Sequence, residues 1–264
     1  MSSLFVMIDG LRPDAIEAAD CPNLAGLLAR SAYTLSARSV MPSVTLPCHM
    51  SIFHSVPPER HGVTTNDWHP MARPLPGLVE QAAHSGKKCA SFISWEPLRD
   101  LSRPLNLEHL YFARDGRAFD YGDQRTAARA AEYITANRPD FAFVYFGTVD
   151  EMGHDTGWMS SEYLRQVARV DEALGMVLAV LGDEDHVLLQ SDHGGHERMH
   201  GTDMAEDLTI PWLVAGPGIR NGYRIEVPVS LLDTAPTLAK LLGIAPDSQW
   251  EGRCVEEAFV EDAS

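Results

Sequence analysis

Short apolar runs that end beside an aspartate recur along this 264-residue chain, and they constrain its fold more than any other feature. Residues 4–8 are continuously apolar and lead directly into Asp9-Gly10, and residues 141–149 lead into Asp150 in the same way. Residues 185–189 form a third, largely apolar run shortly before Asp192. Runs of this length without alternation are typical of strands that are buried on both faces of a parallel sheet.

Helical patterns separate these runs. We predict helices from Pro22, over 47–55, 75–84, 122–137, 160–181 and 231–242, and further strands over 34–40, 87–95 and 211–214. Residues 57–62, with two prolines and a glycine, are predicted to form a loop. The alternation predicts an α/β fold with a mostly parallel sheet and helices on both faces. One domain over residues 1–264 is expected, with a small cap at about residues 96–121, where periodicity is weak.

The composition is that of a soluble globular protein, with 45% hydrophobic and 22% charged residues. We find no apolar run of membrane-spanning length and no signal-peptide pattern at the start, so we expect a cytoplasmic protein that does not bind membranes. The net charge of −16 argues against a nucleic acid polymer as partner. Four cysteines without CxxC spacing indicate buried free thiols. The oligomeric state is left open.

The stretch from 190 to 201 carries most of the chemistry. His193, His196 and His200 lie within nine residues of Asp192, among glycines that let the backbone bend closely around a ligand. Imidazole and carboxylate groups together are the ligands of zinc and similar divalent ions. A histidine-rich surface loop is the alternative interpretation.

The other strand ends supply a second set of ligands. Asp150 and His154 are four residues apart, a spacing that places both on one face of a helical turn, where they can hold one ion. A later histidine, either His196 or His200, would complete that shell. Because ligands of open α/β sheets bind beyond the carboxyl ends of the strands, we expect Asp9 to lie close to these groups.

These ligands suffice for two divalent ions, one held by Asp9, Asp192 and His193. Two ions contribute about +4 and three carboxylates remove about 3, so roughly +1 remains to attract an anionic substrate. Metal ions about 4 Å apart can clamp the attacking and leaving oxygens of a phosphoryl displacement. The sequence therefore favours a metal-dependent phosphohydrolase acting on a small anionic ester.

The attacking group is water or a side chain. Thr45 is the candidate side chain, since it lies at the predicted start of a helix, where free backbone N–H groups and the helix dipole favour an alkoxide and a phosphate oxygen. Metal coordination would lower the pKa of its hydroxyl further. The alternative is that Thr45 only caps the helix.

Several motifs, in this order, resemble those of the alkaline phosphatase superfamily, and most closely its type I phosphodiesterase/nucleotide pyrophosphatase family. They are residues 6–14, 41–51, 58–63 with Asn66, 148–154, 191–194, 199–203 and 233–238. The resemblance extends over nearly the whole chain and implies an alkaline phosphatase-like fold.

The resemblance also implies roles for single residues. Asp150, His154 and His200 would hold a first zinc ion; a second would be held by Asp9, Asp192 and His193 and contacted by Thr45. Thr45 would attack in line to form a phospho-threonine, which a zinc-bound water would hydrolyse. Asn66 would donate a hydrogen bond to a phosphate oxygen. His196 matches no family position and is expected to support a ligand or face solvent. Manganese or iron would suit the same ligands.

The chain departs from the family between the metal-binding motifs. Only six residues separate His193 from His200, where typical members carry a long insertion, so much of the surface that selects a substrate is missing. Five aromatic residues could stack on a substrate ring, although ordinary packing is the simpler interpretation for each. They are Trp68, Trp95, Tyr111, Phe112 and Trp158.

Four other functions are compatible with some of these features. A sulfatase shares the fold but uses a modified Cys or Ser in a Cys-x-Pro-x-Arg pattern, which the stretch Thr45 to His49 lacks. A phosphomonoesterase would need an extra cation, and only Arg38, Arg60 and Arg198 are candidates. A phosphonate hydrolase would use a similar metal pair and threonine. A metal-binding protein without turnover would lack the nucleophile, which is present here.

Overall fold

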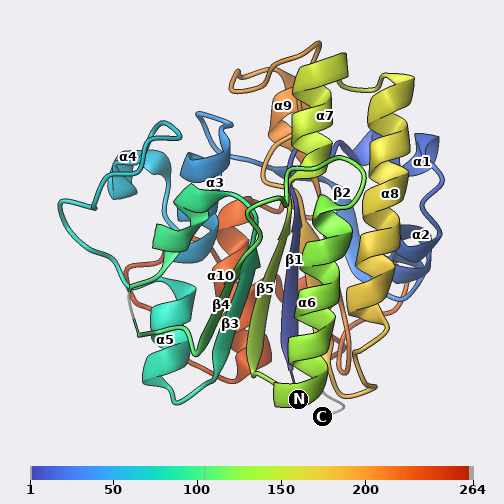
Figure 1. Cartoon of the computed structure of the whole chain (residues 1–264). Helices are drawn as coiled ribbons and strands as arrows, with labels where there is room; N and C mark the ends of the chain where they lie inside the picture. Colours follow the sequence, from blue (N-terminus) through green and yellow to red (C-terminus); the bar gives the residue numbers. More distant parts are fainter. Residues whose placement is uncertain (1, 104, 262–264) are drawn as a thin grey trace.

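The computed structural model describes residues 2–103 and 105–261, and these residues build one sheet flanked by helices (Figure 1). Within the described residues the sheet has eight strands in the order β4-β3-β5-β1-β6-β7-β2-β8. The strands are β1 (Ser3–Ile8), β2 (Ala32–Arg38), β3 (Cys89–Ile93), β4 (His109–Phe112), β5 (Phe141–Phe146), β6 (His186–Gln190), β7 (Thr209–Ala215) and β8 (Tyr223–Arg224).

The sheet is mostly parallel, as predicted. β1 pairs in parallel with both β5 and β6, and β3 pairs in parallel with β4 and β5. Only β7 runs antiparallel, to β6 on one side and β2 on the other. The first strand of the chain thus lies in the middle of the sheet, between two strands that follow it by more than a hundred residues.

Helices cover both faces of the sheet, as the alternating pattern predicted (Figure 1). The helices are α1 (Pro13–Ala18), α2 (Pro22–Ala29), α3 (Thr45–His54), α4 (Pro58–His61), α5 (Leu78–His84), α6 (Gly122–Asn137), α7 (Thr148–Thr156), α8 (Ser161–Leu178), α9 (Ala205–Leu208) and α10 (Thr234–Leu242), with 3-10 turns η1 (Glu96–Leu101), η2 (Leu231–Asp233) and η3 (Glu256–Ala258). In the described part of the chain no helix is both long and apolar enough to cross a membrane.

The alternation of side chains along β1 explains why two separate cores form. Phe5 and Met7 point to the face covered by α3, α5 and α10, while Leu4, Val6 and Ile8 point to the face covered by α1, α2, α6 and α8. Successive side chains of a strand point to opposite faces, so a continuously apolar strand must be covered on both. At roughly 25 cal/mol per Å² of buried apolar surface, these two cores supply the main stabilisation of the fold.

Three segments differ from the sequence prediction. The run 141–149, predicted as one strand, divides into β5 and the start of α7 at Thr148. The predicted loop at 57–62 contains the short helix α4, because Pro57 and Pro58 suit the first turn and Gly62, at φ 79°, ends it. Part of the segment expected to form a cap, about 96–121, belongs to the main sheet instead: it includes β4, which pairs with β3 as the edge strand. Its short, alternately exposed pattern was too weak a signal for a strand.

The cysteines agree with the prediction of free thiols. Cys21, Cys48 and Cys89 are buried and Cys254 is partly buried, and all four are unpaired.

Candidate metal centre and active site

Three adjacent strand ends bring the three aspartates together. Asp9 directly follows β1, Asp192 follows β6 by one residue, and Asp150 lies in the first turn of α7, which begins just after β5. Because β1 lies between β5 and β6, the carboxyl ends of these parallel strands are neighbours at one edge of the sheet. The site is therefore a consequence of strand order, which joins groups more than 130 residues apart in sequence.

One group of ligand atoms converges on the Nε2 atom of His193. Asp9 Oδ1 lies 3.3 Å from it, Asp192 Oδ2 lies 3.4 Å away, and the hydroxyl of Thr45 lies 3.2 Å away. All four side chains are buried. The structure thus brings together the residues predicted for the second metal ion, with Thr45 beside them.

The second group centres on Asp150. Its Oδ2 lies 3.6 Å from His154 Nε2, across one helical turn of α7, and its Oδ1 lies 3.6 Å from His200 Nε2. Ligand atoms of Asp150, His154 and His200 all lie within 4.8 Å of one another, as do those of Asp9, Asp150 and His193. Asp150 belongs to both of these three-residue sets, so the two candidate metal positions are adjacent.

The hydrogen bonds of the carboxylates show that these residues fit divalent ions. Asp9 Oδ1, Asp150 Oδ1 and Asp192 Oδ2 are buried and have no hydrogen-bond partner. The other oxygen of Asp192 is occupied, since it accepts from the backbone N–H groups of Gly10 and His193. A buried carboxylate oxygen without a donor is costly, and cations bound beside these oxygens would satisfy them.

The histidines are also oriented to bind divalent ions. The Nδ1 atoms of His154, His193 and His200 lie 2.8–2.9 Å from the carbonyl oxygens of Arg198, Gly194 and Ser43. A carbonyl only accepts, so each Nδ1 carries the proton, and each Nε2 offers its lone pair to the site.

Burial and charge set the protonation of the site. Burial and the charges of Asp192 and Asp150 raise the pKa of Asp9 well above its usual value, and burial raises the pKa of Asp150 to about 6. Burial opposes ionisation of Asp192, but His193 and His49 outweigh it and lower its pKa. Burial, with the nearby His193, lowers the pKa of His200 to about 3, so this histidine is neutral and able to bind metal.

The metal-free protein is expected to lose stability as the pH rises from about 4 to about 6. The folded-state pKa of Asp150 lies above the unfolded value of 3.8, so the folded state binds more protons in this window, and its stability falls as they dissociate. Bound cations should cancel this loss of stability. The gap between the melting temperatures with and without Zn²⁺, measured from pH 4.5 to 7.5, should therefore widen with pH. A gap that stays constant or narrows contradicts this.

Thr45 is the first residue of α3, and Val44 is its N-cap, so Thr45 is not a capping residue. This helix start offers fewer free backbone donors than expected. The N–H of Leu46 donates to Asn66 Oδ1 at 3.0 Å, and Pro47 has no N–H. With its oxygen occupied by the N–H of Leu46, the residue after Thr45, Asn66 keeps its side-chain NH₂ group as a donor.

His196 is not part of either group of ligand atoms. Its Nδ1 lies 2.7 Å from Oδ1 of the buried Asp207, whose other oxygen accepts from Thr202. His196 and Met199 exchange backbone hydrogen bonds around a tight turn, in which Glu197 has φ 47°. Spacing allowed either His196 or His200 as the third ligand with Asp150 and His154. His200, which the family resemblance implied, is the one that lies beside Asp150.

Sequence reasoning missed two residues beneath the second metal position. The hydroxyl of Tyr145 donates to Asp9 Oδ2 at 2.5 Å, and His49 Nδ1 donates to the carbonyl of Thr45 at 2.8 Å while its ring packs on Tyr145. The signal for Tyr145 was a single hydroxyl in the otherwise apolar strand β5. His49 lies inside the motif that carries Thr45, but its position alone gave it no function.

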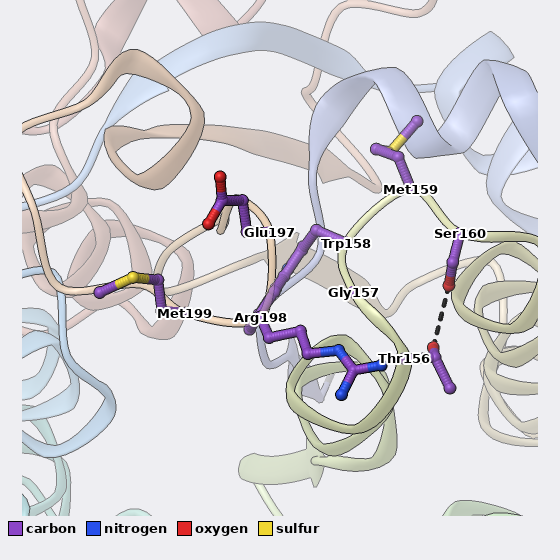
Figure 2. Close-up of a pocket in the computed structure, with 8 residues that line it drawn as sticks. All are labelled: Thr156, Gly157, Trp158, Met159, Ser160, Glu197, Arg198 and Met199. Atoms are coloured by element: carbon purple, nitrogen blue, oxygen red, sulfur yellow. Dashed lines mark hydrogen bonds between the residues drawn. The ribbon is translucent and has the colours of Figure 1, made fainter.

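A pocket of about 660 Å³ lies beside the hairpin turn at 196–199 and the α7–α8 connection (Figure 2). Trp158 lines it, but its indole is 7% exposed, donates to the carbonyl of Gly10 and packs against Gly153 and Gly195. Packing is therefore sufficient to explain this tryptophan. Trp68, by contrast, is 41% exposed.

Two family models match the chain. Residues 118–246 match the metalloenzyme superfamily, and residues 3–82 match the type I phosphodiesterase/nucleotide pyrophosphatase family. The chain is thus similar to the metalloenzyme superfamily over residues 118–246, and the carboxylate and imidazole groups of the site are ligands that a metalloenzyme needs. Residues 3–82 resemble the type I phosphodiesterase/nucleotide pyrophosphatase family, which confirms the resemblance predicted from the motifs.

Similar proteins include hydrolases of two kinds. The chain is 25% identical over 219 residues to bis(5'-adenosyl)-triphosphatase enpp4 of Mus musculus, covering 72% of this chain and 46% of that protein. It is 32% identical over 118 residues to arylsulfatase K of Danio rerio, covering 38% of this chain and 22% of that protein. The chain thus spans less than half the length of these relatives.

Solved structures share the fold at low identity. Murine ectonucleotide pyrophosphatase/phosphodiesterase 5 superposes with a TM-score of 0.80 at 16% identity, covering 98% of this chain and all of that chain. A 2-O GAG sulfatase gives a TM-score of 0.82 at 16% identity, covering 97% of this chain and 74% of that chain.

Proposed function

We propose that this chain is a two-metal phosphohydrolase that cleaves a small anionic phosphate ester, a diester in preference to a monoester, through Thr45. The observation that carries the proposal is the cluster around His193 Nε2, in which two unpartnered carboxylate oxygens and the Thr45 hydroxyl lie within 3.4 Å. A hydroxyl placed among metal ligands at a helix start is suited to nucleophilic attack.

Asp150, His154 and His200 would hold one ion, and Asp9, Asp192 and His193 the other. When bound, the ions would lower the pKa of the Thr45 hydroxyl and neutralise charge on the phosphoryl group. We propose zinc, because three imidazole nitrogens with three carboxylate oxygens suit it; manganese and iron are the alternatives.

The residues around the phosphoryl group would have different catalytic roles. Thr45 Oγ1 loses its proton and attacks phosphorus in line as the bond to the leaving oxygen breaks, and the leaving group takes up a proton and departs. Water then hydrolyses the phospho-threonine, which releases the phosphate product and restores the hydroxyl of Thr45. The NH₂ group of Asn66, held by Leu46 N–H on its oxygen, donates to a phosphate oxygen as charge develops there. In support, one solved structure of murine ectonucleotide pyrophosphatase/phosphodiesterase 5 is of an inactive threonine-to-alanine variant in complex with AMP.

The charges around the site favour a diester over a monoester. A dianionic monoester benefits from an additional cation on its terminal oxygens. Arg60 forms an ion pair with Glu251, and the side chain of Arg198 extends toward Thr156 in the pocket (Figure 2). Arg38, the third candidate, is exposed at the end of β2. None of the three arginines has a contact with Thr45 among the described residues. A phosphonate ester would present the same single negative charge and is the second candidate, supported by fold similarity to a phosphonate monoester hydrolase from Silicibacter pomeroyi.

The first test is hydrolysis of an aryl phosphodiester and the matching monoester by zinc-loaded protein. We expect a higher kcat/KM for the diester. A preference for the monoester would contradict the diester proposal, and hydrolysis of an aryl sulfate alone would contradict a phosphohydrolase. Two bound ions without turnover of any of these esters or an aryl phosphonate would favour a protein that binds metal without catalysis.

Replacing Asn66 by alanine should lower kcat/KM for the diester by about 10- to 1000-fold, the range for loss of one donor to a developing oxyanion. The effect should fall mainly on kcat, because the hydrogen bond strengthens as charge develops. Steady-state kinetics of Asn66→Ala, with Asn106→Ala as a control outside the site, measure it. Unchanged kcat in Asn66→Ala would remove this residue from the proposal.

A further inference from the structure

The strand β5 carries one hydroxyl group in a sequence of six buried residues, Phe-Ala-Phe-Val-Tyr-Phe. That hydroxyl belongs to Tyr145, which is 4% exposed and lies opposite Met7 of β1. A buried tyrosine hydroxyl needs a hydrogen-bond partner, and this one donates to Asp9 Oδ2 at 2.5 Å. It therefore contacts a candidate metal ligand from beneath the site.

This hydrogen bond leaves the two oxygens of Asp9 unequal. Oδ2 is occupied by the tyrosine, whereas Oδ1 is buried without a partner and lies 3.3 Å from His193 Nε2. Rotation of the carboxylate would break the bond to Tyr145 and turn the free oxygen away from His193. The hydroxyl thus selects the one orientation in which Asp9 offers a single oxygen beside His193.

The ring of Tyr145 is itself held in place. His49 packs edge-on against it, with ring centroids 5.6 Å apart at 65°, and His49 Nδ1 donates to the carbonyl of Thr45 at 2.8 Å. Both rings are buried among the side chains of the core beside α3. The support for Asp9 is therefore connected to the helix start that carries the candidate nucleophile.

We propose that Tyr145 is a positioning residue that holds Asp9 as a one-oxygen ligand and so sets the affinity of the second metal position, formed by Asp9, Asp192 and His193. The inference rests on the metal ligands of the proposed function. Tyr145 has no hydrogen bond to Asp150, His154 or His200 among the described residues, so the first position should be insensitive to it. Supporting groups of this kind typically change metal affinity by about 10- to 100-fold.

The test is stepwise Zn²⁺ binding to the full chain, measured by competition with a chromophoric chelator, in wild type and in Tyr145→Phe. This substitution removes only the hydroxyl. We expect the second equivalent to bind about 10- to 100-fold more weakly in Tyr145→Phe, and the first to bind as in wild type. Two bound equivalents without hydrolysis of any ester by the wild type would overturn the proposed function but leave this measurement intact.

Tyr163→Phe is the matched control. Tyr163 is also buried, and its hydroxyl donates to the carbonyl of Gly10, next to Asp9, at 2.8 Å without contacting a carboxylate. We expect both equivalents to bind to Tyr163→Phe within about threefold of wild type. Equal weakening in the two variants would show that any lost hydroxyl disturbs the site and would overturn the proposal. Unchanged binding by Tyr145→Phe, equal weakening of its two equivalents, or a wild type that binds a single equivalent would also overturn it.

Wild-type protein provides a second readout if Tyr145→Phe does not fold. When the second equivalent binds, the charge on Asp9 changes beside the phenol, so the near-ultraviolet difference spectrum of tyrosine should change mainly with that equivalent. The Tyr163→Phe protein should give the same spectral change. A spectrum that does not respond to the second equivalent, or that loses its response in Tyr163→Phe, would overturn the inference.

Discussion

Replacing Thr45 by alanine should lower kcat/KM for a phosphodiester by about 1000-fold or more, because it removes the attacking oxygen of a covalent mechanism. The hydroxyl is buried and lies 3.2 Å from His193 Nε2, among the atoms that would hold the second ion. The metal ligands on the strand ends remain in this variant. Zn²⁺ content should therefore stay at two equivalents while turnover is lost.

Three further measurements test whether the loss of activity is specific to the hydroxyl of Thr45. Thr45→Ser keeps a hydroxyl and should retain part of the activity, whereas Thr65→Ala, on the exposed loop before Asn66, should behave as wild type. Mass spectrometry of quenched wild-type protein should find a phosphate on the peptide that contains Thr45. Near wild-type turnover by Thr45→Ala would show that water attacks directly, and the covalent mechanism would be abandoned.

Removing the metal ions should lower the melting temperature by about 10–20 °C. An ion present at 100 times its dissociation constant stabilises the folded state by about 2.7 kcal/mol, and two ions by about 5 kcal/mol. For a chain of this size each kcal/mol shifts the melting temperature by roughly 2–4 °C. The structural reason is that three buried carboxylate oxygens are left without a partner and the charged aspartates repel one another.

The measurement is a thermal melt of chelator-treated protein before and after metal is added back. Zn²⁺ should restore the melting temperature and activity together. Ca²⁺ should restore neither, because it prefers oxygen ligands in larger number than this site offers. A melting temperature that changes by less than about 2 °C on chelation would mean that the ligand residues do not hold ions tightly in the folded protein.

Local patterns were sufficient for much of the fold and the site. The apolar runs before Asp9 and Asp150 predicted buried strands, and β1 and β5 lie there. The spacing of Asp150 and His154 predicted a shared helical face, and α7 places Oδ2 of the one 3.6 Å from Nε2 of the other. These predictions succeed because backbone periodicity is set by residues close in sequence. The edge strand β4 was not predicted, because its four residues, which are alternately exposed, carry little periodic signal.

The sequence by itself determined the class of fold, the identity of the candidate ligands and the place of Thr45 at a helix start. Spacing left His196 and His200 open and the family resemblance implied His200; the tertiary structure shows why, since His200 lies beside Asp150 while Asp207 holds His196 through a contact that spacing does not encode. Only the tertiary structure decided which oxygen of Asp9 is free and that Tyr145 lies beneath it. The physical reason is that strand order determines which side chains meet. It places Tyr145 and Asp9, 136 positions apart in sequence, within hydrogen-bonding distance.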